Sequence, residues 1–103
     1  MPLLKEMGKG TKKMDKVFLK LYITGHTPRS ELAINNLQRI CQERLLNHYE
    51  LDIVDILEHP QLAEQEKILA TPTLVRLSPP PVRRLIGDLS NTEKVLMGLG
   101  LQS

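Results

Sequence analysis

Few side chains in this 103-residue chain could carry out covalent chemistry, and a single cysteine is the first of them. A thiol–disulfide oxidoreductase needs Cys-x-x-Cys at the turn after its first strand. The corresponding turn here, Gly25-His26-Thr27-Pro28, contains no cysteine. Cys41 falls instead on an apolar helical stripe, where a thiol packs as a small hydrophobic side chain. We therefore expect no redox site and a buried Cys41.

Histidines and carboxylates do not form a metal or acid–base site either. His26, His48 and His59 each stand at an expected turn or helix end, without the spacing that metal ligation requires. Asp52 and Asp55 lie three residues apart in one expected strand, so their side chains point to opposite faces. A glycine-rich phosphate loop is also missing. The sequence therefore predicts a protein that is not an enzyme and holds no metal or cofactor.

The composition narrows the class of protein. The formal charge is +2 with both signs mixed and only 3% aromatic residues, which argues against nucleic-acid binding. Apolar runs stay well below the roughly 18 residues of a membrane-spanning helix, and the start does not resemble a signal peptide. One cysteine fits a reducing compartment. We expect a cytoplasmic protein that binds neither nucleic acid nor membrane.

Residues 1–14 differ from the rest of the chain. They carry Lys5, Lys9, Lys12 and Lys13 among glycines and lack an apolar period, so we expect a mobile basic tail. Residues 15–103 are enough for one domain with its own core.

The first half of that domain reads as strand, helix, strand. Both faces of residues 17–24 are largely apolar, which predicts a central strand. Thr27 and Pro28 predict the N-cap and first residue of a helix that reaches about Leu46. Residues 49–56 alternate apolar and acidic side chains, so one face of this second strand is expected in solvent.

The second half is organised around residues 68–90. Pro72 ends a short helix that begins at His59-Pro60, and we expect Leu69 on the inner side of that helix. Two short strands, residues 74–77 and 82–86, flank a proline loop that cannot continue a sheet. A capping box at residues 90–93 opens the last helix. The order βαβαββα and a parallel first pair predict an α/β, thioredoxin-like fold, with Thr71-Pro72 at the cis-proline position.

Two features of the second half bear on function. Gly98 and Gly100 each disfavour a helix interior by about 1 kcal/mol, which leaves this region undecided between helix and strand. The simpler alternative is a helix that ends in a glycine C-cap after Met97. Prolines beside arginines suit a protein interface, although a solvated charged face is the simpler alternative. The residues of this predicted partner surface are Lys67, Arg76, Pro79, Pro80, Pro81, Arg83 and Arg84.

Three runs of the sequence resemble the KaiB family of circadian-clock proteins. They are HPQLAE (residues 59–64), KILATPTL (67–74) and PPPVRRLIGDLS (79–90). Residues 19–22 and 25–28 also match the first strand and turn of the family. The resemblance covers residues 17–99, nearly the whole chain.

The resemblance implies a non-enzymatic clock regulator. A thioredoxin-like monomer of the family docks on a KaiC ATPase hexamer and opposes KaiC phosphorylation, and Lys67, Pro72, Arg83 and Arg84 match the KaiC-side pattern. Family members are also metamorphic: a homo-oligomer, tetramer or dimer, holds the second half in an alternative fold (βαββααβ). Pro72, Gly98 and Gly100 are the expected fold-switch positions.

The chain departs from the family at the edge strand that contacts KaiA. This site corresponds to Tyr49, Leu51, Asp52 and Ile53, and Asp52 stands where a lysine is usual. Leu32 likewise replaces a usual arginine, so KaiA binding is in question and a divergent KaiC is the expected partner. The alternative is a permanently thioredoxin-like binding module, similar to the KaiB-like sensor domain of clock histidine kinases.

Overall fold

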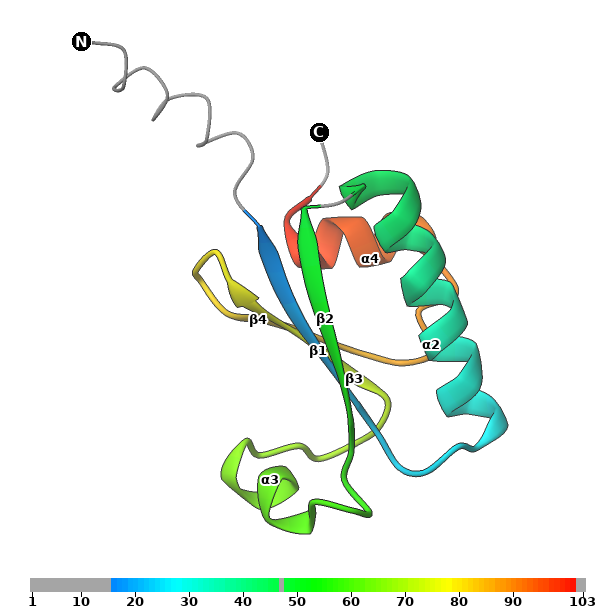
Figure 1. The fold of residues 1–103 in the computed structure, drawn as a ribbon, viewed down its shortest axis with the longest axis vertical. Helices are drawn as coiled ribbons and strands as arrows, with labels where there is room; N and C mark the ends of the chain where they lie inside the picture. The colour runs from blue at the N-terminus through cyan, green and yellow to red at the C-terminus, as the bar shows by residue number, and fades with distance from the viewer. Residues whose placement is uncertain (1–15, 47, 102–103) are drawn as a thin grey trace, which may run out of the picture.

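A four-stranded sheet forms the centre of the computed structural model, which describes residues 16–46 and 48–101 (Figure 1). The expected tail, residues 1–14, lies outside the described residues. The strands are β1 (Val17–Ile23), β2 (Tyr49–Asp55), β3 (Thr73–Ser78) and β4 (Arg83–Ile86). The helices are α2 (Pro28–Ile40), which continues as the π-helical turn η1 (Cys41–Leu45), α3 (Pro60–Gln65) and α4 (Thr92–Leu99).

The strand order is β2-β1-β3-β4, which makes β1 central as predicted. β1 and β2 are parallel, with Val17 opposite Tyr49 and Ile23 opposite Asp55. β3 pairs antiparallel with both β1 and β4. This is the predicted thioredoxin-like arrangement, and the Thr71–Pro72 peptide bond is cis.

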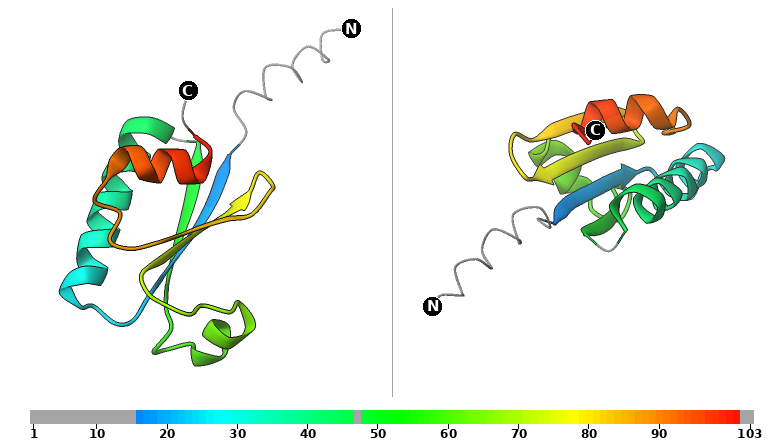
Figure 2. Two further views of the ribbon diagram at one scale, coloured as in Figure 1. Left: turned by 180° about the vertical axis from the view of Figure 1, so that it is seen from behind. Right: turned by 90° about the horizontal axis from the view of Figure 1, so that it is seen from above.

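Each face of the sheet has its own apolar cluster. The larger cluster lies between the sheet and helices α2 and α4, and the predicted stripe of α2, including Cys41, is buried in it (Figure 2). The smaller cluster lies on the α3 side and contains Tyr22, Val54, Ile68 and Val75. The alternation of side chains along β1 therefore supplies both clusters, because successive residues point to opposite faces.

The structure corrects three expectations about the helices and the segments that flank them. The helix that begins at Pro28 is α-helical only to Ile40, and the chain then leaves η1 through Leu46 at φ 51°. The N-cap of α4 is Asn91 rather than Ser90, since Asn91 Oδ1 accepts a hydrogen bond from the Lys94 amide at 3.1 Å. Leu69 is 93% exposed, and Ile68 is buried in its place.

The position of Leu69 has a local cause. Helix α3 ends at Gln65, and Lys67 then takes a left-handed conformation at φ 55°. This turn breaks the helical period before residue 69, so the inward position falls on Ile68. The residue type does not reveal this turn, because the left-handed residue is a lysine and not the usual glycine.

The two glycines near the end of the last helix, Gly98 and Gly100, have different structural roles. A glycine does cap α4, but the cap is Gly100 at φ 71° and not the position directly after Met97, because the helix continues through Gly98 to Leu99. Gly98 lies inside the helix, and a Cβ there would stand 2.2 Å from Leu85 Cδ2. The helix can therefore approach β4 closely only without a side chain at this position.

Candidate functional site

The predicted partner surface is divided between the two faces of the sheet. Arg83 is paired with Arg76 across the β3–β4 ladder, and Arg84 is paired with Val75. Since neighbouring residues of a strand point to opposite faces, Arg83 lies on the α4 face and Arg84 on the α3 face. Both side chains are exposed.

Arg76 is placed differently from the expectation that it belongs to an exposed surface. Only 5% of the residue is exposed, and its guanidinium donates hydrogen bonds to the carbonyls of Leu99 and Pro81. Burial and the neighbouring charge of Arg83 lower the pKa of Arg76. Arg76 therefore fastens the C-terminal end of α4 and the proline loop to β3, and it is not available to a partner.

Arg84 also bonds to backbone carbonyls, but it does so on the α3 face, where it is exposed. Its guanidinium donates to the carbonyls of Glu66, at 2.6 Å, and Lys67, at 3.2 Å. These bonds hold the turn between α3 and β3, from which Lys67 and Leu69 project into solvent. We call the exposed residues Lys67, Leu69 and Arg84 the α3–β3 surface.

The proline loop joins β3 to β4 at the other end of that ladder. The peptide bonds before Pro79 and Pro81 are cis. Pro79 is half-buried, whereas Pro80, Pro81 and Val82 are exposed. Arg83 lies near Gly100 on the α4 face, so it is on the opposite face of the sheet from Arg84 and the rest of the α3–β3 surface.

The predicted edge-strand site is at the outer edge of the sheet, because β2 is its terminal strand. Tyr49 and Leu51 are half-buried, while Asp52 and Ile53 are exposed. A groove of about 640 Å³ lies beside the C-terminal half of β2 and is bordered by α2 and the segment leading into α3. Its charged rim is largely acidic: Glu31, Asp52, Asp55 and Glu58, with Lys20 as the lysine among them.

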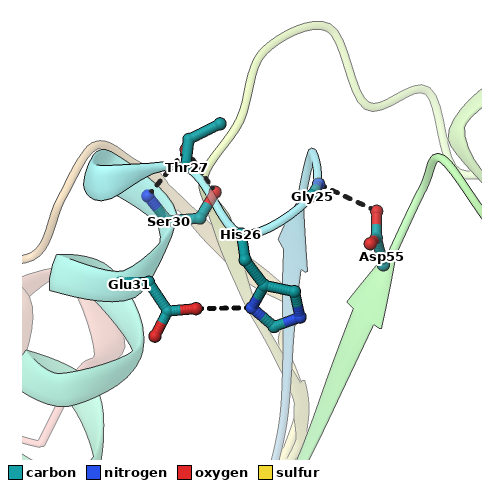
Figure 3. A network of polar contacts seen from close by, with 6 residues as sticks. All are labelled: Gly25, His26, Thr27, Ser30, Glu31 and Asp55. Carbon is teal, nitrogen blue, oxygen red and sulfur yellow. Dashed lines mark hydrogen bonds and ion pairs between the residues drawn. The ribbon is translucent and has the colours of Figure 1, made fainter.

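Polar contacts at one end of this groove fix the turn between β1 and α2 (Figure 3). Asp55 Oδ1 accepts hydrogen bonds from the amides of Gly25 and Leu57, both at 2.9 Å, and these bonds lower the pKa of Asp55. His26 Nδ1 is paired with the carboxylate of Glu31, which raises the pKa of His26. The N-cap is Thr27, as predicted, and it accepts from the Ser30 amide at 3.1 Å.

The turn that carries cysteines in redox proteins thus carries a structural polar network. Cys41 is buried at the far end of α2, and burial raises the pKa of its thiol to about 11. Within residues 16–46 and 48–101, we find no group of three His, Cys, Asp or Glu side chains placed to hold a metal ion. Across the same residues, the helices are too short or too polar to span a membrane.

Leu69 is the candidate binding residue that reasoning from the sequence missed. An apolar residue after a helix is more often buried than exposed, so the pattern favoured the core. The available signal was Ile68, which also fits the inward position and leaves Leu69 on the opposite side. The structure thus adds an apolar side chain beside Lys67.

Comparison with known proteins gives a consistent result at the level of family. A family model described as the KaiB domain matches residues 20–101. The circadian clock protein KaiB3 of Synechocystis sp. is 57% identical over 88 residues, 85% of this chain and 86% of that protein. The circadian clock oscillator protein KaiB of Prochlorococcus marinus is 57% identical over 83 residues, 81% of this chain and 79% of that one.

Solved structures agree in fold. The N-terminal domain of Synechococcus elongatus SasA superposes with a TM-score of 0.69 at 22% identity, covering 86% of this chain and 88% of that one. Fasciola hepatica thioredoxin superposes with a TM-score of 0.68 at 14% identity, covering 96% and 93%. Because both identities are low, these likenesses concern the fold alone.

Proposed function

This chain belongs to the KaiB family, and from that premise we propose that it is a non-enzymatic, cytoplasmic clock regulator that binds a KaiC ATPase hexamer and modulates KaiC phosphorylation. The observation that carries the proposal is the α3–β3 surface. Leu69 is 93% exposed there beside Lys67, within one of the runs that resemble the family.

This surface is suited to binding because its backbone is already fixed. Arg84 holds the carbonyls of Glu66 and Lys67, and Thr73 Oγ1 donates to the Ala70 carbonyl. A partner would therefore meet an ordered turn and would not have to order it on binding, which lowers the entropic cost of association. An exposed leucine flanked by two cations offers an apolar contact with a charged rim.

The test is the affinity of the purified chain for a KaiC hexamer with ATP, measured by biolayer interferometry. We expect Leu69→Ser to weaken binding at least tenfold without lowering the melting temperature, because Leu69 makes little contact with the core. Leu57→Ser is the matched control, since Leu57 is also an exposed leucine, at 65%, and lies beside Gly25 in the segment that follows β2. Equal affinity of both variants would remove the α3–β3 surface from the proposal. A wild-type chain that binds no tested KaiC would remove KaiC as the partner.

The alternative is a binding module that rests permanently in the thioredoxin-like fold. The similarity to the SasA domain favours it only as a fold. Size-exclusion chromatography with light scattering separates the two. A tetramer or dimer that converts slowly into a KaiC complex is expected of a fold-switching regulator, with Pro72, Gly98 and Gly100 as the switch positions. A monomer that binds at once supports the permanent module.

A further inference from the structure

The outer edge of β2 carries a row of negative charge. Glu50, Asp52 and Asp55 belong to the strand, and Glu58 follows it. Asp52 and Glu58 are exposed, and hydrogen bonds from two backbone amides keep Asp55 ionised. Lys20, opposite Asp52 on β1, offsets only part of this charge. An exposed strand edge also offers backbone groups that can pair with another extended segment.

The chain itself supplies a segment of opposite charge next to this edge. Residues 1–15 contain four lysines and two acidic residues. Lys16, where the described chain begins, lies over β2, since its Nζ is 3.2 Å from Glu50 Oε2. We propose that residues 1–15 bind along the outer edge of β2 in the same molecule, antiparallel to it, and compete there with partner strands.

The direction in which residues 1–15 run along β2, and how far they reach, follow from the register between β1 and β2. Val17 stands opposite Tyr49 and the two strands are parallel, so a segment that leads into Val17 from outside β2 must run antiparallel to β2. Crossing β2 spans two strand spacings, about 10 Å, which uses about three residues. The remaining dozen residues reach roughly 40 Å, whereas a seven-residue strand is about 20 Å long. Lys12 and Lys13 then lie near Glu50, and Lys5 lies near Asp55 and Glu58.

Paramagnetic relaxation enhancement tests this placement. A nitroxide is attached to Thr11→Cys or to Leu4→Cys in a Cys41→Ala background, and the amide signals of the full chain are measured at low salt. We expect the label at residue 11 to broaden amides near Tyr49 and the label at residue 4 to broaden amides near Asp55 and Glu58. Both effects should fall several-fold in 0.5 M salt, because surface charges are screened within about 5 Å there.

Charge variants provide the controls. Neutralising Asp52 and Glu58, as Asp52→Asn with Glu58→Gln, should reduce the broadening at β2 several-fold. Glu93→Gln, an exposed acidic residue on α4, is the matched control and should leave it unchanged. Broadening spread evenly over the molecule, centred on another surface, or reversed in order between the two labels would overturn the proposal. The experiment contains no KaiC, so its failure is distinct from failure of the proposed function.

Discussion

Arg76 allows the sharpest test of how the second half of the fold is held together. Its guanidinium joins β3 to the Leu99 carbonyl at the end of α4 and to the Pro81 carbonyl of the proline loop. Arg76→Met keeps the length and much of the volume of the side chain while it removes both hydrogen bonds. The variant therefore measures the contribution of these two hydrogen bonds to stability, and not the effect of a new cavity.

The expected magnitude is a balance of two effects. Each hydrogen bond from a charged donor contributes about 1.5–3 kcal/mol, so the two together contribute about 3–6 kcal/mol. The cost of burying the guanidinium offsets part of this, because no carboxylate accompanies it among its hydrogen-bond partners and its buried Nε has no partner in the described chain. We expect Arg76→Met to lower the free energy of unfolding by about 2 kcal/mol, as two carbonyls lose their donors.

Thermal and urea unfolding followed by circular dichroism measure this change. For a domain of this size, 2 kcal/mol corresponds to a melting temperature lower by roughly 8–16 °C. The matched control is Arg83→Met on the opposite strand, which is exposed and should change stability by less than about 0.5 kcal/mol. An Arg76→Met protein that melts within 2 °C of wild type would refute the reasoning, since the burial cost would then equal the hydrogen-bond gain.

Three further predictions concern single sites. Removing the N-cap of α2 by Thr27→Ala should cost about 1 kcal/mol in urea unfolding, whereas Thr92→Ala at the first residue of α4 should cost less, because Asn91 is the cap there. Burial raises the thiol pKa of Cys41 from 9.0 to about 11, so the folded state disfavours the thiolate. The free energy of unfolding should therefore fall as pH rises from 9 to 11, and Cys41→Ala should flatten that part of the profile of stability against pH. The change in the free energy of unfolding caused by Gly98→Ala should be more favourable in a Leu85→Ala background than in wild type, by at least about 1 kcal/mol, because Leu85 occupies the space of the new Cβ. Equal effects in the two backgrounds would contradict the close approach of α4 to β4.

The sequence was sufficient for those features that depend on local pattern. Alternating apolar residues in β1, Thr27-Pro28 at the start of α2 and the proline-bounded strands each carry a short-range signal, and together they predicted the order and the pairing. The burial of Arg76 has no such signal, and the exposure of Leu69 depends on a turn that the residue types do not reveal. Arg76 is buried because carbonyls from α4 and the proline loop converge on it, and Leu69 is exposed because Lys67 adopts a left-handed turn.

The strand order also separates charge across the molecule. Acidic side chains gather at the β2 edge, while Arg83 and Arg84 belong to β4 at the opposite edge. Within the described residues, this arrangement of charge amounts to an electric dipole across the sheet, which residues 1–15 would partly offset when bound along β2 as proposed. Such a dipole exerts a torque in the field of a charged surface, so the molecule is turned before contact and its association rate depends on ionic strength. Stopped-flow association rates that fall with added salt would reveal this orientation.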